Sequence, residues 1–103
     1  MAYKLIITEK TEGLLDNLVY HLIYKLKNEQ AAVHLFDCIG RIYDRLEENP
    51  LQFPESRDAG LQRLGYREAV LTDMDYVIMF RIEGAFVYVT GIFHQLENYR
   101  EKV

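Results

Sequence analysis

Three runs rich in aromatic and β-branched residues occupy the last third of the sequence, and their spacing limits how they can pair. They cover about residues 65–72, 75–83 and 85–93, and their composition is typical of β-strands. Only Asp73-Met74 and Glu83-Gly84 separate them. Such short links can join antiparallel strands, whereas parallel strands need a crossover of about a dozen residues or more. The sequence therefore predicts a three-stranded antiparallel meander.

Two amphipathic helical patterns precede these strands. Thr8 is the expected N-cap of the first, over about residues 9–27, and Asn28 is the expected N-cap of the second. Asn49-Pro50 ends the second helix, because the residue before proline leaves the helical region and proline lacks a backbone donor. The apolar stripes recur at steps of three and four, and they comprise Leu15, Leu18, Val19, Leu22, Ile23 and Leu26, then Ala32, Leu35, Phe36, Ile39, Ile42, Tyr43 and Leu46. So short a connection predicts an antiparallel helical hairpin.

The remaining segments complete an α+β fold of the order β-α-α-β-β-β. Residues 3–7 form a short strand, which must join the sheet to cover its own apolar side chains, and residues 50–64 are expected to be irregular. The helical hairpin then packs on one face of a four-stranded, mainly antiparallel sheet, followed by a short C-terminal segment from Gln95. The opposite face is left for water or a partner. Residues 1–103 fit one compact domain.

The charge argues against a protein whose main task is to grip nucleic acid. The net charge is −4, with 16 acidic residues against 12 basic ones, whereas such proteins carry a basic excess because phosphate neutralisation supplies most of their affinity. Within residues 57–82, four arginines are offset by four acidic residues. Any RNA-binding activity must therefore depend on a small, focused patch.

The single cysteine and the histidines carry no strong functional signal. Cys38 lies in the apolar pattern of the second helix, so we expect a buried thiol in a reducing compartment. His21 and His34 lie beside the apolar stripes and are expected at the helix surface or its boundary. No residue set has zinc-ligand spacing, and no apolar run reaches membrane length. We expect a cytoplasmic protein with no metal, no small-molecule cofactor and no membrane contact.

The expected hairpin turn also predicts a strand register. If Glu83-Gly84 forms a two-residue turn, Ile82 pairs with Ala85. Arg81 and His94 then share a sheet face but lie ~27 Å apart along it. They cannot form one site in that register.

The ordered set of these segments resembles the RelE/ParE toxin superfamily of bacterial toxin–antitoxin modules, over essentially the whole chain. The segments that carry the resemblance are the N-terminal strand, Asn49-Pro50 after the second helix, Gly65-Tyr66-Arg67, residues 75–82, and Ile92-Phe93-His94 with Tyr99. The resemblance implies a small bacterial cytoplasmic toxin, neutralised by a cognate antitoxin whose tail wraps it. RelE-like members cut mRNA in the ribosomal A site, whereas ParE-like members inhibit DNA gyrase.

The resemblance also implies candidate residues for a nuclease site. RNA cleavage by a 2′-hydroxyl needs a proton acceptor, a proton donor and a cation for the phosphorane. Arg67 stands where the family has a basic residue on its second strand, His94 where several branches have a histidine, and Tyr99 near a terminal aromatic of some nucleases. Under the nuclease hypothesis Arg67 clamps phosphate, and His94 or Tyr99 transfers protons. Glu97 and Glu68 are weaker options.

Charge and composition favour one branch over the other. Residues 65–83 contain no lysine and the net charge is acidic, so a ParE-like toxin with a protein target such as DNA gyrase is favoured over a RelE-like, ribosome-dependent mRNA endoribonuclease. A third hypothesis is a non-toxic interaction module that keeps the fold and the antitoxin groove. Arg67 and Arg81 are the expected partner contacts. The sheet face of Arg67 stays open, because a turn one residue longer at Asp73-Met74 would reverse it.

Overall fold

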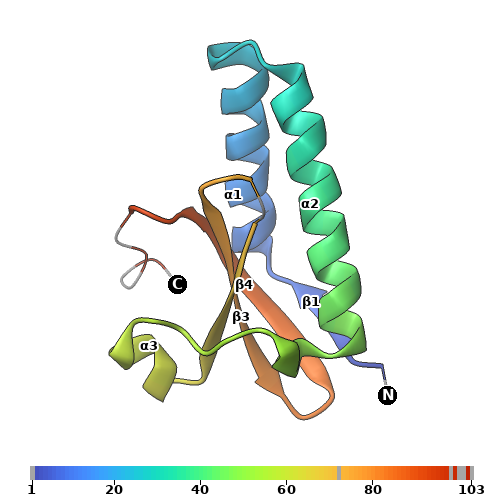
Figure 1. Cartoon of the computed structure of the whole chain (residues 1–103), viewed down its shortest axis with the longest axis vertical. Helices are drawn as coiled ribbons and strands as arrows, with labels where there is room; N and C mark the ends of the chain where they lie inside the picture. The colour runs from blue at the N-terminus through green and yellow to red at the C-terminus, as the bar shows by residue number, and fades with distance from the viewer. Residues whose placement is uncertain (1, 72, 98, 100–101, 103) are drawn as a thin grey trace.

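The computed structural model describes residues 2–71, 73–97, 99 and 102, and it has the expected α+β architecture (Figure 1). The elements in chain order are β1 (Lys4–Ile7), α1 (Glu9–Tyr20), the π-helical turn η1 (His21–Lys25), α2 (Glu29–Glu48), the 3-10 turn η2 (Pro50–Gln52), α3 (Ala59–Arg63), β2 (Tyr66–Val70), β3 (Tyr76–Glu83) and β4 (Phe86–His94). The sheet order is β1-β4-β3-β2, with β1 parallel to β4 and the other pairs antiparallel. The predicted four-stranded, mainly antiparallel sheet is confirmed.

The predicted caps define the helical hairpin. The side chain of Thr8 accepts a hydrogen bond from the Thr11 N–H (3.2 Å), and that of Asn28 accepts one from the Ala31 N–H (3.0 Å). These bonds satisfy donors that lack a partner in the first turn of a helix. The second helix ends before Asn49, as predicted. Figure 1 shows α1 and α2 side by side, rising beyond the sheet as an antiparallel pair.

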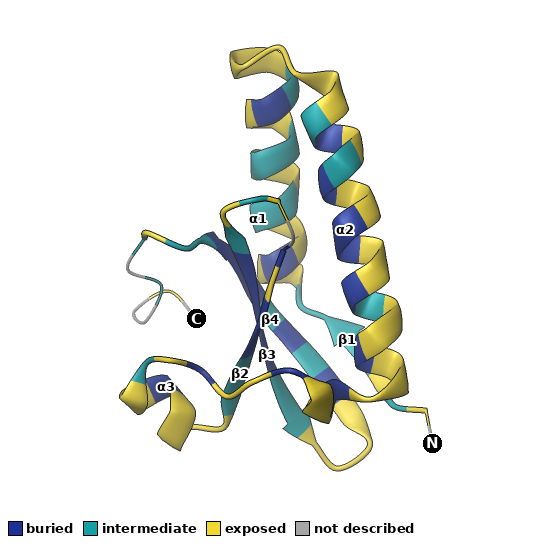
Figure 2. Cartoon of the chain, viewed as in Figure 1, coloured by how far each residue is buried: buried dark blue, intermediate teal, exposed yellow. Residues whose placement is uncertain are grey.

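The main core lies between the hairpin and one face of the sheet, which we call the hairpin face. Figure 2 shows the buried stripe of α2 turned toward buried residues of β3 and β4. The stripe comprises Ala32, Leu35, Cys38, Ile39, Ile42 and Leu46; the sheet supplies Ala69, Ile78, Phe80, Val87, Val89 and Ile92, and Leu71 follows directly after β2. The buried Thr11 hydroxyl donates to the Val89 carbonyl at 2.9 Å, which ties α1 to β4.

The opposite side of the sheet, which we call the outer face, is only partly open. Leu61 of α3 and Tyr99 pack there against Val77, Met79 and Phe93. The expectation that this whole face is left for water or a partner is therefore wrong. Part of the cover comes from Tyr99, and part comes from α3. The expectation of an irregular segment 50–64 is wrong as well, because that segment contains η2 and α3.

The turn between β3 and β4 differs from the predicted one. Gly84 and Ala85 form it, so Glu83 pairs with Phe86, and the predicted pairing of Ile82 with Ala85 is wrong. Gly84 has a φ of 61°, a left-handed conformation that favours glycine in a tight turn.

An irregularity in β4 then reverses the side-chain alternation. The register shifts between Met79 and Phe80, so that Arg81 pairs with Tyr88 while Tyr76 pairs with His94. The extra residue puts His94 on the hairpin face and leaves Arg81 on the outer face. The prediction that these two residues share a face is wrong. Their wide separation is confirmed, because Tyr88 and His94 lie six positions apart in β4, or ~20 Å.

Candidate functional site

Arg67 lies on the hairpin face, where its cross-strand partner is the buried Phe80. Its Nη1 donates to the Phe53 carbonyl oxygen at 2.7 Å, and its Nη2 lies 3.9 Å from a Glu55 carboxylate oxygen. The side chain is 22% exposed. Arg67 therefore fastens the segment before α3 to the edge strand β2, and its guanidinium is turned toward the protein.

Glu68, the next residue, points to the outer face and is almost fully buried. Its carboxylate accepts a hydrogen bond from Arg57 Nε at 2.8 Å and another from the Tyr99 hydroxyl at 3.3 Å. The Tyr99 ring stacks on Phe93, with 5.8 Å between centroids. Burial, followed by the negative charge of Glu68, raises the pKa of Tyr99, while the hydrogen bond to Glu68 raises the pKa of Arg57. This cluster holds Tyr99 against the sheet as a protonated donor.

His94 terminates β4 and organises the turn that follows. Its Nδ1 accepts a hydrogen bond from the Leu96 N–H at 3.1 Å, and its own N–H donates to Glu97 Oε1 at 2.8 Å. Burial opposes ionisation of Glu97, but hydrogen bonds from Lys102 and from the His94 N–H outweigh it and lower the pKa of Glu97. His94 and Glu97 therefore stabilise a local turn. Under the nuclease hypothesis His94 is a candidate for proton transfer, and in the structure it is engaged in this turn.

The three residues expected in a nuclease site do not converge. Arg67 and His94 pair with residues of β3 that lie four positions apart, Phe80 and Tyr76, which corresponds to ~13 Å along the strand. Tyr99 packs on the other side of the sheet. No single bound phosphate can meet all three side chains in this arrangement.

Arg81 stands in a different environment, in a cross-strand row on the outer face. Its neighbours are Tyr66 of β2 and Tyr88 of β4, and we call these three residues the Tyr66–Arg81–Tyr88 row. The Arg81 Cζ lies 5.3 Å from the centroid of the Tyr66 ring, and Phe86 extends the aromatic surface, 6.3 Å from the Tyr88 ring. The Arg81 Nη2 is 3.6 Å from a Glu83 carboxylate oxygen, and the Arg81 side chain is 40% exposed.

Tyrosine and arginine are enriched at the energetic centres of protein interfaces, and a guanidinium beside aromatic rings can donate paired hydrogen bonds to a carboxylate. Arg81 was identified from the sequence as a partner contact. The two tyrosines flank Arg81 only in the observed register, in which Arg81 pairs with Tyr66 on one side and Tyr88 on the other.

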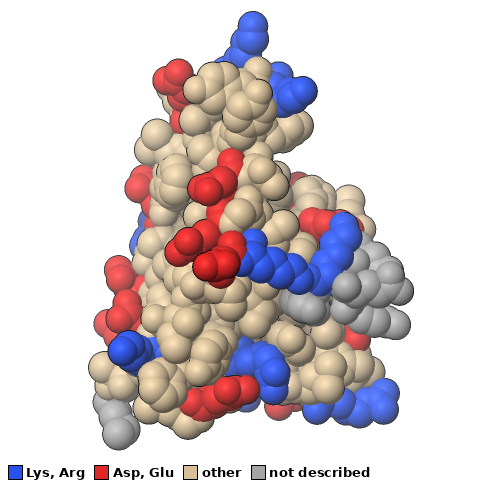
Figure 3. Space-filling view, turned by 180° about the vertical axis from the view of Figure 1, so that it is seen from behind, with Lys and Arg blue, Asp and Glu red and all other residues tan. Residues whose placement is uncertain are grey.

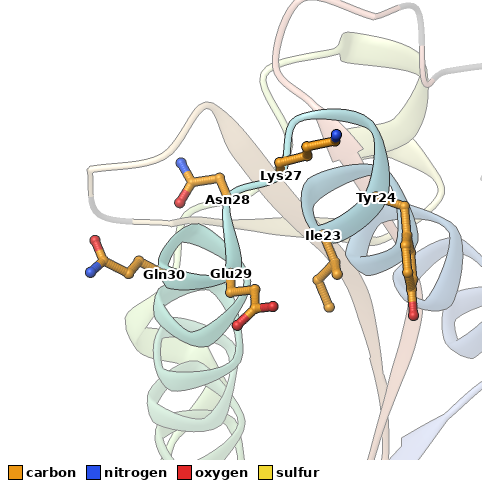
Figure 4. A pocket seen from close by; sticks show the side chains of 6 residues that line it. All are labelled: Ile23, Tyr24, Lys27, Asn28, Glu29 and Gln30. Atoms are coloured by element: carbon orange, nitrogen blue, oxygen red, sulfur yellow. The ribbon is translucent and has the colours of Figure 1, made fainter.

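Other surface features offer less chemistry. A hollow of about 670 Å³ lies at the hairpin tip and is shown in Figure 4. The Lys27 amine points to the opposite side from the side-chain amides of Asn28 and Gln30, so these polar groups do not converge on a ligand. Viewed from behind, acidic side chains are spread along the hairpin, while basic side chains are visible at its tip and also across the middle and lower part of the molecule (Figure 3).

Within the described part of the chain, no group of three His, Cys, Asp or Glu side chains is placed to hold a metal ion. Among the same residues, no helix has the length and apolar character needed to cross a membrane.

Comparisons with known proteins agree with this architecture. A family model described as the ParE toxin of type II toxin-antitoxin system, parDE, matches residues 5–99. A chain of the solved "Chromosomal ParDE TA system from P. aeruginosa" is similar, with a TM-score of 0.71 and 20% identity over 90% of this chain and 96% of that chain. At that identity the likeness shows the fold. No curated protein sequence matches this one.

Proposed function

Because this chain belongs to the ParE toxin family of type II toxin–antitoxin systems, we propose that it arrests bacterial growth by binding a protein target such as DNA gyrase. A cognate antitoxin of the ParD type neutralises it in the cytoplasm. The target contact lies on the outer face of the sheet, at the Tyr66–Arg81–Tyr88 row. The observation that carries this proposal is the position of Arg81, half-exposed between two tyrosines on neighbouring strands.

The geometry supports Arg81 more strongly than Arg67 as the partner contact. The Arg67 guanidinium already donates to the Phe53 carbonyl oxygen and lies near Glu55, so a partner must break internal contacts to reach it. Arg81 instead faces an aromatic ring and an exposed carboxylate. Arg67 supports the surface indirectly, by holding the segment that leads into α3 against β2.

The endoribonuclease hypothesis receives less support. Cleavage needs a proton acceptor, a proton donor and a cation around one phosphate, and Arg67, His94 and Tyr99 are dispersed over two faces of the sheet. The acidic net charge points the same way.

The test compares two activities of the purified chain. We expect inhibition of gyrase-catalysed DNA supercoiling and no cleavage of ribosome-bound mRNA. Arg81→Ala should weaken gyrase binding by roughly tenfold or more, as expected for an interface residue that costs above ~1.4 kcal/mol when truncated. Arg63→Ala is the matched control, because Arg63 is an exposed arginine of α3 outside the row.

Each alternative has its own result. Transcript cleavage with normal supercoiling supports the RelE-like alternative. Antitoxin binding without growth arrest, in the absence of both activities, supports the non-toxic interaction module. If Arg81→Ala inhibits gyrase as strongly as Arg63→Ala and wild type do, the row is not the target contact. Circular dichroism of each variant checks that the fold persists.

A further inference from the structure

One flank of α2 carries a nucleophile, a base and two cations in a line. His34, Cys38, Arg41 and Arg45 follow one another at spacings of four, three and four residues, which places them on one side of a helix. That side borders the buried stripe and lies across a cavity from Val70 and Asp73. None of these four residues contributes to the Tyr66–Arg81–Tyr88 row.

The thiol and the imidazole are in direct contact. His34 Nε2 lies 3.6 Å from Cys38 Sγ, and Nδ1 lies 4.0 Å from it. Cys38 is 6% exposed and His34 is half-buried. The thiolate is the reactive form of cysteine, and a neighbouring imidazole can accept the thiol proton. Cys38 and His34 both line the space beside this side of α2.

That space is a cavity of about 250 Å³ lined by the four residues of the flank together with Ile42, Val70 and Asp73. Hydrogen bonds within the protein orient the two arginines of this cavity. Arg41 Nε donates to the Asp37 carbonyl oxygen, while Arg45 Nε donates to Gln52 Oε1 and its guanidinium lies 4.6 Å above the Phe53 ring. Anchoring through Nε orients the Nη groups, which are the donors that pair with carboxylates.

We propose that this cavity binds an anionic low-molecular-weight disulfide and that Cys38 is modified there by thiol–disulfide exchange. Arg41 and Arg45 pair with the carboxylates of the ligand and direct its sulfurs toward Cys38. His34 takes the proton from the Cys38 thiol, and the thiolate attacks one sulfur of the disulfide. The old S–S bond breaks as the mixed disulfide forms, and the leaving thiolate recovers the proton from His34.

The modification is independent of the proposed target. The adduct lies in the cavity between α2 and the residues Val70 and Asp73, whereas the row lies on the outer face of the sheet. Adduct formation is measured as a change in mass, whereas the target is tested by gyrase inhibition. Either proposal can therefore fail without affecting the test of the other.

Oxidised glutathione is the probe, because it carries carboxylates around a disulfide. The folded chain is incubated with increasing concentrations of it, and the adduct is followed by intact-mass spectrometry. We expect a single adduct, absent in Cys38→Ser, whose rate saturates with probe concentration. The neutral probe 2-hydroxyethyl disulfide should react without saturation. His34→Gln should slow the reaction roughly tenfold or more, as loss of a general base does.

Arginine variants test the binding step without touching the thiol. Arg41→Gln and Arg45→Gln should raise the glutathione concentration needed for half-maximal rate and leave the rate with the neutral probe unchanged. Arg63→Gln is the matched control on another element. The proposal is overturned if the folded chain gains no adduct while the urea-unfolded chain does. It is equally overturned if both probes react without saturation and all arginine variants behave alike.

Discussion

The ion pair between Arg57 and Glu68 should respond very differently to the loss of each member. Glu68 is 2% exposed, whereas the Arg57 side chain is 64% exposed. Arg57→Ala leaves a buried carboxylate without its cation, a change that costs about 3–5 kcal/mol when both partners are buried. Because the Arg57 side of this pair is open to solvent, water can replace part of the lost interaction. We therefore expect a loss of about 2 kcal/mol in the free energy of unfolding.

Glu68→Met removes the buried charge itself. Methionine fills a similar volume beside Met79, the cross-strand neighbour, and Arg57 can then extend into water. Replacing a buried ionic group by an apolar one of similar volume is often neutral or stabilising. The Tyr99 hydroxyl loses its acceptor, but Tyr99 is only half-buried, so this loss is small. We expect a free energy of unfolding within about 1 kcal/mol of wild type.

Urea unfolding at pH 7, followed by circular dichroism, measures both changes. The control is Arg63→Ala, another exposed arginine, which we expect to change stability by no more than about 0.5 kcal/mol. We therefore expect Arg57→Ala to lower the free energy of unfolding more than Glu68→Met does. If Glu68→Met is the more destabilising of the two, the carboxylate contributes more through its own contacts than its burial costs, and the reasoning fails.

Three further substitutions test local features of the structure. Gly13 lies in α1 with nothing within 4 Å of an added Cβ, so Gly13→Ala should stabilise the protein by about 0.5–1 kcal/mol in urea unfolding. Gly84 has a φ of 61°, so Gly84→Ala should lower the free energy of unfolding by about 1–2 kcal/mol. Burial, and then the negative charge of Glu12, raises the pKa of Tyr43 to about 12. The folded state therefore keeps this phenol protonated after the unfolded state has begun to lose its proton near pH 10. The corresponding stability is present below pH 10 and falls between about pH 10 and 12, so Tyr43→Phe should make this fall shallower when unfolding is measured across that range.

The fold could be predicted because its main signals are periodic and local. The stripes of the two helices, the caps Thr8 and Asn28, and the short links between the last three strands each depend on neighbouring residues. The short helix α3 lacks such a signal, since it spans only Ala59–Arg63 and depends on a single Asp58 cap. A helix of this length is too short to show a repeating apolar pattern or to be stable in isolation. It forms because Leu61 packs on the outer face of the sheet.

The candidate site was harder to predict because it depends on register. With the turn at Gly84-Ala85, Ile82 pairs with Val87 instead of the predicted Ala85. The irregularity in β4 then places His94 on the opposite face of the sheet from the predicted one. Neither the position of the turn nor the extra residue in β4 changes the composition or the apolar periodicity of the sequence enough to be detected. Sequence reasoning could identify Arg67, Arg81 and His94 as residues of interest, but their grouping follows from pairings between strands.

Three arginines near the last strands differ in what a partner must displace to reach them. Arg57 donates to a buried carboxylate, and Arg67 donates to a backbone carbonyl oxygen at 2.7 Å. Breaking such charge-assisted bonds costs about 1.5–3 kcal/mol each when a group is left unsatisfied. Arg81 contacts a ring at 5.3 Å and an exposed carboxylate at 3.6 Å, and an exposed ion pair contributes about 0–1 kcal/mol. Arg81 can exchange its contacts for those of a partner at the lowest cost, and this difference is the physical reason to place the target contact at the Tyr66–Arg81–Tyr88 row.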